Sequence, residues 1–143
     1  MKQLTSLAIT IFLSVFLKAQ EKIQFKYDNG QVIEEGYLDK DNNKTGEWKK
    51  YLEDGSLWSI VNYDKGTVIA KTFYVDSEWV QTYKEICTYY RAITKQDDGY
   101  YKCNDFWITG ELQMTGKYKD LNLVIKEGEF VWYHKTGQKR IVT

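Results

Sequence analysis

The sequence contains no proline, and this absence constrains how its turns are built. Ten glycines, together with asparagine and aspartate, must supply them. Glycine adopts positive φ angles without a steric penalty, so a glycine that ends a short polar run indicates a tight turn. Histidine and cysteine are also scarce, with one and two copies. A zinc site needs three or four such ligands, so we expect no metal centre and no cofactor.

Charge of one sign is not in excess. The 143 residues include 20 basic and 20 acidic side chains. A surface that grips nucleic acid needs net positive charge to displace the counterions of the phosphates. The neutral composition therefore argues against a nucleic-acid partner, and the length corresponds to about one domain.

Long hydrophobic runs are missing as well. The apolar stretch Leu7–Leu17 has eleven residues, whereas a membrane-spanning helix needs about 20. A lysine precedes the stretch and Lys18-Ala19-Gln20 ends it, which is the layout of a cleavable signal peptide. We expect residues 1–19 to be this signal and residues 20–143 to be a domain exported to the periplasm or medium. An N-terminal anchor or buried helix is the alternative.

The two cysteines, Cys87 and Cys103, could form a disulfide in an exported protein. The turn sequence Gln96-Asp97-Asp98-Gly99 predicts a hairpin that places Cys103 opposite Ala92 and not opposite Cys87. A disulfide requires Cα atoms within about 7 Å. The sequence therefore leaves the bridge undecided.

Eight of the ten glycines fall into two sets with almost the same spacing. The gaps within the sets are 6, 10 and 9 residues, then 6, 12 and 9. The stretches GEWKKYLEDG (46–55) and GEFVWYHKTG (128–137) occupy matching places. Two copies of one unit therefore span about 22–66 and 103–142, with a divergent middle at 67–102. The two sets are Gly30, Gly36, Gly46 and Gly55, and Gly110, Gly116, Gly128 and Gly137.

Runs of five to nine residues rich in valine, isoleucine, threonine and aromatic side chains lie between these turns. Such runs bounded by turn residues are typical of an antiparallel β-meander. We therefore expect an all-β sheet of about nine or ten strands made of repeated hairpins. Alternation places Leu57, Ser59 and Val61 on one face. Exposed edge strands would leave the oligomeric state open.

Residues 76–94 are ambiguous. Their rings and Ile86 recur at intervals of 4, 3 and 4 residues, which is helical spacing. The second half of the segment has strand composition. We expect a strand over residues 85–94 and consider a short helix the alternative.

The ordered glycines and aromatic residues resemble the bacterial variant of the MORN repeat, which occurs in antitoxin-like repeat proteins. The resemblance implies an elongated meander of stacked hairpins that serves as an interaction or scaffold module and has no catalytic residues of its own. In the first unit it rests on Tyr27, Gly30, Gly36, Tyr37, Gly46, Trp48, Tyr51, Gly55, Leu57, Tyr63 and Gly66. In the second unit it rests on Trp107, Gly110, Leu112, Gly116, Tyr118, Gly128, Phe130, Tyr133 and Gly137.

Patterns for catalysis are weak. His134 has no evident nucleophile or orienting partner. Residues 39–43 start like a calcium loop but lack its glycine and its final glutamate. Glu47 and Glu129 occupy equivalent places in the two units, and a hydrolase would need such a pair about 5–10 Å apart. We expect both to face solvent, and a small carboxylate-dependent hydrolase is the least favoured hypothesis.

Aromatic residues that recur along the meander are the binding candidates. Rings on a sheet either stack on sugars, peptides or lipid head groups, or pack across strands as the core. The leading hypothesis is a non-enzymatic exported module that binds a protein, a lipid or an envelope polymer, with peripheral membrane contact included. An antitoxin- or immunity-like inhibitor is the alternative. The expected surface comprises Trp48, Tyr51, Trp58, Trp107, Phe130, Trp132 and Tyr133.

Overall fold

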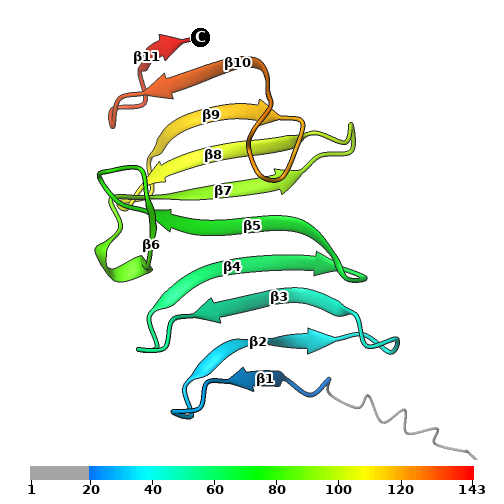
Figure 1. The fold of residues 1–143 in the computed structure, drawn as a ribbon. Helices are drawn as coiled ribbons and strands as arrows, with labels where there is room; N and C mark the ends of the chain where they lie inside the picture. Colours follow the sequence, from blue (N-terminus) through cyan, green and yellow to red (C-terminus); the bar gives the residue numbers. More distant parts are fainter. Residues whose placement is uncertain (1–19) are drawn as a thin grey trace, which may run out of the picture.

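A computed structural model describes residues 20–143, which form one open antiparallel sheet (Figure 1). Each strand pairs with the next along the chain, except that the short β6 pairs with β5 beside the main path. This confirms the all-β meander of hairpins, with eleven strands in place of nine or ten. The predicted signal peptide lies outside the described residues. The elements are β1 (Ile23–Lys26), β2 (Val32–Leu38), β3 (Lys44–Tyr51), β4 (Leu57–Asp64), β5 (Thr67–Val75), β6 (Gln81–Thr82), the 3-10 turn η1 (Lys84–Ile86), β7 (Tyr89–Lys95), β8 (Tyr101–Trp107), β9 (Leu112–Tyr118), β10 (Lys126–Tyr133) and β11 (Lys139–Val142).

Seven hairpin turns share one pattern of backbone hydrogen bonds. The first residue of the turn donates its N–H to the carbonyl four residues on, and the fourth residue donates back to the first. The fourth residue has positive φ in every case. Five of the seven have glycine there, one has Asn42 and one has Trp79. The turns begin at Tyr27, Asp39, Leu52, Asp76, Gln96, Trp107 and His134.

Gly36 and Gly116 serve a different purpose, because neither has positive φ. The ring of Trp48 on β3 lies across Gly36, and a Cβ built there would come within 2.4 Å of it. The ring of Phe130 on β10 lies across Gly116, where the corresponding distance is 2.2 Å. The glycine spacing of the two units therefore reflects this contact between a glycine and a ring as well as the turns.

One cluster of the hydrophobic core lies on one face of the C-terminal half of the sheet, and Trp48 and Val61 are buried in the N-terminal half. Its buried members come from β7, β8, β9 and β10, and they are Ile93, Cys103, Met114, Tyr118 and Phe130. The loop between β9 and β10 crosses in front of β8 in Figure 1, and its leucines 121 and 123 pack against this core. The single sheet thus covers its own core with a loop in place of a second layer.

A buried ion pair lies beside this core. Arg91 on β7 and Asp105 on β8 are direct cross-strand neighbours. The arginine Nε and Nη2 each donate to one carboxylate oxygen at 2.7 Å, and Asp105 is only 1% exposed. Burial alone would lower the pKa of Arg91, but the bonds and charge of Asp105 raise it overall. Arg91 is therefore held in its charged form within the sheet.

The register around the cysteines differs from the prediction by one residue. Cys103 lies opposite Ile93, not Ala92. The turn from Gln96 to Tyr100 contains a bulge at its glycine, and this extra residue shifts the register. Both cysteines are free thiols, and burial raises the pKa of Cys103 to about 12.

The predicted strand over residues 85–94 starts later than expected. β7 begins at Tyr89, and η1 precedes it as a single 3-10 turn. The helical spacing was misleading, because Ile86 is 56% exposed and joins no core. The divergent middle nevertheless continues the sheet through β5 and β7. No helix within residues 20–143 has the length and apolar character needed to cross a membrane.

Candidate functional site

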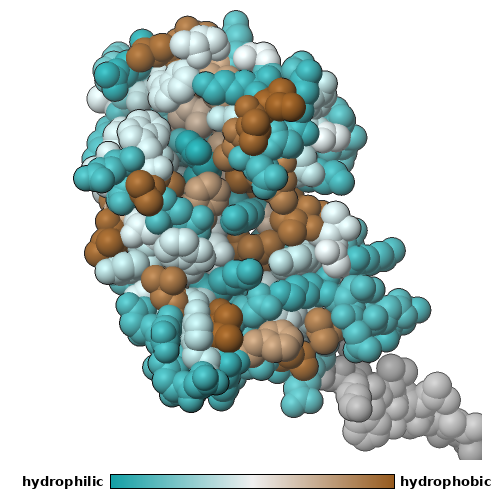
Figure 2. All heavy atoms as spheres, viewed as in Figure 1, coloured by the Kyte–Doolittle hydropathy of each residue, from teal (hydrophilic) through white to brown (hydrophobic). Residues whose placement is uncertain are grey.

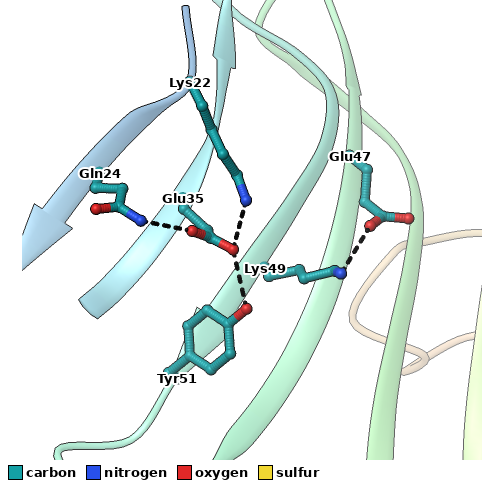
Figure 3. Close-up of polar contacts among 6 residues, drawn as sticks. All are labelled: Lys22, Gln24, Glu35, Glu47, Lys49 and Tyr51. Atoms are coloured by element: carbon teal, nitrogen blue, oxygen red, sulfur yellow. Dashed lines mark hydrogen bonds and ion pairs between the residues drawn. The ribbon is translucent and has the colours of Figure 1, made fainter. Parts of the chain in front are cut away.

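The glutamates at equivalent repeat positions do not meet. Glu47 is on β3 and Glu129 on β10, with five strands of the sheet between them. Neighbouring strands are about 4.8 Å apart, so the two strands are separated by roughly 29 Å along the sheet. The Glu47 side chain is 54% exposed and its carboxylate is 3.6 Å from Lys49 Nζ (Figure 3). These two carboxylates therefore do not flank one substrate as a glycosidase pair must.

Glu35 has a structural role in the same region (Figure 3). Its carboxylate is 2.7 Å from Lys22 Nζ and accepts hydrogen bonds from Gln24 at 2.8 Å and from the Tyr51 hydroxyl at 3.1 Å. The bond from Lys22, followed by that from Gln24, lowers the pKa of Glu35. Burial and the bond to Glu35 raise the pKa of Tyr51. Tyr51, predicted as a surface residue, instead joins β3 to β1 and β2 through Glu35.

Other candidates are also engaged in packing or turns. Trp48 is fully buried between the rings of Phe25 and Tyr63, at centroid distances of 6.3 and 6.4 Å. Phe130 is 2% exposed within the core. Trp58 is half-buried on β4, and His134 is exposed at the start of a turn. Within residues 20–143, no three His, Cys, Asp or Glu side chains are grouped as metal ligands.

Figure 2 shows that apolar atoms on the visible face form separate patches among polar ones. The remaining candidates are Trp107, Trp132 and Tyr133, and these three lie together.

They line a pocket of about 340 Å³ at one end of the sheet. β8 and β10 end there and β9 and β11 begin there, with the β5–β6 turn alongside (left in Figure 1). Hairpin connections place all five segments at the same end although they span more than sixty residues. The full set of lining residues is Trp79, Trp107, Gln113, Trp132, Tyr133, Arg140, Ile141 and Thr143. We call this the tryptophan pocket.

Two polar atoms in the residues of the tryptophan pocket lack hydrogen-bond partners. The indole Nε1 of Trp107 is a buried donor and the amide Oε1 of Gln113 is a buried acceptor, and neither is bonded to any described residue. Four side-chain atoms of this kind occur in the described part of the chain, so half of them fall here. Leaving a buried polar group unpaired costs about 1–3 kcal/mol. Both atoms are closed to solvent, so their missing hydrogen bonds are a cost to the fold and not contacts open to a ligand.

Two basic side chains lie at or near the pocket. Arg140 is exposed among the lining residues, and Lys135 Nζ lies 5.2 Å from the centre of the Trp107 ring. No aspartate or glutamate side chain lines the pocket within residues 20–143. The pocket therefore offers mainly aromatic faces to a ligand.

Sequence reasoning missed Trp79 and Gln113. Trp79 has the positive φ of 67° that glycine takes in five equivalent turns, and it is 66% exposed. The Asp76 carboxylate holds this turn by accepting the backbone N–H groups of Glu78 and Val80. The stretch DSEWV could have drawn attention, because it has the polar residues of a glycine turn and a tryptophan where glycine belongs. Gln113 had no comparable sequence feature.

Comparison with known proteins gives one match. Residues 44–65, which comprise β3, its turn and β4, match the protein family described as MORN repeat variant. No curated protein and no solved structure shows a significant match. The matched stretch contains Gly46, Trp48 and Tyr51 of the first unit. This stretch is therefore similar to a MORN repeat, and such a repeat suggests a module for binding interactions.

Proposed function

We propose that the protein is a non-enzymatic binding module that works outside the cytoplasm and takes its ligand in the tryptophan pocket. One observation carries this proposal. Trp79, Trp107 and Trp132 converge from the β5–β6 turn, β8 and β10, whereas the repeat rings Trp48 and Phe130 are fully packed. Aromatic side chains that keep an open face are enriched at binding sites.

The lining residues favour binding over catalysis. General acid–base chemistry relies most often on histidine, and also on carboxylate, lysine, tyrosine or cysteine groups within hydrogen-bond reach of the substrate. Within residues 20–143, Tyr133 is the one such side chain in the pocket lining, and no histidine, carboxylate or cysteine side chain lines the pocket with it. The apolar stretch at residues 7–17 and the lysines around it support a location in the cell envelope or outside the cell.

The test is co-sedimentation of residues 20–143 with insoluble cell-envelope material from the native cell. We expect the wild-type protein to sediment saturably, and Trp107→Ala and Trp132→Ala to remain in the supernatant. Trp58→Ala is the matched control, because it removes the same side chain from β4 outside the tryptophan pocket. Equal sedimentation of all four proteins, or none by the wild type, would overturn the proposal.

Treating the envelope material before mixing separates the classes of partner. If the protein is an antitoxin- or immunity-like inhibitor, its partner is a protein, and protease treatment of the envelope material would abolish sedimentation. If the ligand is a lipid, solvent extraction of the material would abolish sedimentation. A polymer ligand would survive both treatments.

A further inference from the structure

We infer that β11 binds an extended acidic peptide as an added strand, with one large apolar side chain of the peptide in the tryptophan pocket. This inference rests on the proposed function and names the class of its ligand. Three observations at this end of the sheet carry it: an open strand edge, a pocket beside the edge, and basic side chains on the strand.

The edge of the sheet at β11 has open backbone groups. β11 is the last strand in the sheet order, and all four of its residues are exposed. Thr143, directly after β11, donates its N–H to the Phe130 carbonyl at 2.9 Å and accepts the Phe130 N–H at 2.7 Å. Bonding alternates along an antiparallel strand, so the N–H and carbonyl of Val142 point away from β10. No other strand of residues 20–143 lies on that side to pair with them.

These backbone groups select a peptide over other ligands. An extended peptide that joins a sheet edge gains main-chain hydrogen bonds, and pockets for its alternate side chains give specificity. A saccharide or a hydrocarbon chain does not carry amide donors and acceptors at the spacing of a strand. The edge therefore makes a choice of ligand that the aromatic lining of the pocket does not make.

The tryptophan pocket lies directly beside this edge. Ile141 of β11 and Trp132 of β10 both line it, and the two are direct cross-strand neighbours. Cross-strand neighbours have their side chains on one face of a sheet. In a strand added to β11, the residue opposite Ile141 therefore has its side chain on the face that holds the pocket. A large apolar side chain at this position contacts the aromatic lining.

The charges on β11 select an acidic peptide. Lys139 and Arg140 are exposed, and neither forms an ion pair within residues 20–143. Opposite charges across two strands are favourable and like charges are unfavourable. Two β11 strands side by side would bring two basic side chains from each copy to one seam, and the other edge strand, β1, carries Lys26 and no acidic residue. An acidic peptide therefore suits this edge better than a second copy of the chain.

The test is ¹⁵N NMR of the protein during titration with the synthetic peptide acetyl-Thr-Val-Phe-Glu-Glu-Thr-amide. In antiparallel pairing, its valine lies opposite Val142, its phenylalanine opposite Ile141 and its first glutamate opposite Arg140. We expect the backbone amide signal of Val142 and the indole signal of Trp132 to shift saturably, and the indole signal of Trp58 to stay in place. The same peptide with lysine at both glutamate positions should bind about tenfold more weakly.

Two N-methylated peptides distinguish strand addition from filling of the pocket by a side chain alone. A methyl group on the valine nitrogen removes the N–H that donates to Val142 and should lower the affinity about tenfold or more. A methyl group on the phenylalanine nitrogen points away from β11 and should leave the affinity within about threefold. Equal affinity of the two N-methylated peptides would refute backbone pairing.

Two variants of one residue test the same bond from the protein. Val142→Pro removes the outward N–H, which an edge strand tolerates, and should weaken binding of the unmodified peptide about tenfold. Val142→Thr keeps the N–H and should bind like the wild type.

Envelope co-sedimentation separates failure of this inference from failure of the proposed function. If the peptide shifts no signal, and protease-treated envelope material still sediments the wild type but not Trp132→Ala, the inference fails and the proposed function stands. If the Val142 signal shifts with protein concentration and not with the peptide, the edge binds a second copy and the inference also fails.

Discussion

Alanine at position 36 should disrupt the packing contact that defines the repeat. Gly36 lies under Trp48, and an added Cβ would come within 2.4 Å of the ring, whereas ordinary contacts begin at 3.4 Å. The ring would have to retreat by about 1.0 Å, the difference between these distances. It is fully buried between Phe25 and Tyr63, and its indole N–H donates to the Tyr37 carbonyl at 3.0 Å.

The expected cost follows from these contacts. Overpacking a well-filled site costs about 1–3 kcal/mol, and losing the indole hydrogen bond costs about 1 kcal/mol more. We therefore expect Gly36→Ala to lower the free energy of unfolding by about 2–4 kcal/mol. Trp48→Ala should cost about 3–5 kcal/mol by itself.

The double variant distinguishes this mechanism from a general glycine effect. Once Trp48 is alanine, the methyl group at position 36 has room, so the double variant should be no less stable than Trp48→Ala to within about 0.5 kcal/mol. The two changes are then coupled by about 2–4 kcal/mol, as residues in direct contact can be. Urea denaturation followed by far-ultraviolet circular dichroism measures all four proteins without relying on tryptophan. Trimethylamine N-oxide keeps the weakest of them folded enough to measure.

Gly30→Ala is the matched control. Gly30 has φ of 86° and nothing within 4 Å of its missing Cβ, so its cost of about 1–2 kcal/mol comes from the backbone alone. That cost should be the same with or without Trp48. Additive costs for Gly36→Ala and Trp48→Ala would refute the packing argument.

The buried polar groups give two further predictions. Arg91→Ala leaves the charge of Asp105 unpaired and should cost about 3–5 kcal/mol, whereas Arg91→Met with Asp105→Leu should stay within about 2 kcal/mol of wild type in urea denaturation. Burial raises the pKa values of Cys103 and Tyr89 to about 12 from 9.0 and 10.0, which favours their protonated forms in the folded state. The free energy of unfolding should therefore fall as pH rises from about 9 to 12, less steeply in Cys103→Ala. An equal slope in that variant would contradict this assignment.

The meander could be predicted because its determinants are local. Gly30 and Gly55 indicate positive φ at a turn, and the β-branched and aromatic runs between the turns indicate strands. The role of Gly36 could not be separated from theirs, because all three are glycines in one spacing pattern. Only the structure shows that Gly36 accommodates a ring while the other two serve the backbone.

The tryptophan pocket could be predicted only in part, because it depends on contacts between distant segments. Trp48 and Trp132 lie on β3 and β10, which are equivalent strands of the two units. Phe25 and Tyr63 cover the first, whereas the second lines an open pocket with Trp79 and Ile141. Whether a ring is buried depends on the side chains of the neighbouring strands, and those side chains can be distant from the ring in the sequence. Trp79 was missed because a tryptophan at a glycine turn position is contrary to turn preferences.

Trp79→Gly tests the central claim most directly, because a structural role and a binding role predict opposite results. Relief of the left-handed strain gains about 1–2 kcal/mol. Loss of the edge contact with Tyr89 costs about 0.5–1.5 kcal/mol, and the added flexibility of glycine costs about 0.4–1 kcal/mol. The net change in the free energy of unfolding should therefore be close to zero.

The decisive measurement is envelope co-sedimentation of Trp79→Gly beside the wild type, with a urea denaturation curve of each preparation to confirm equal stability. We predict that Trp79→Gly is as stable as the wild type and stays in the supernatant. A protein that is as stable and sediments fully would show that the tryptophan pocket is not the binding site.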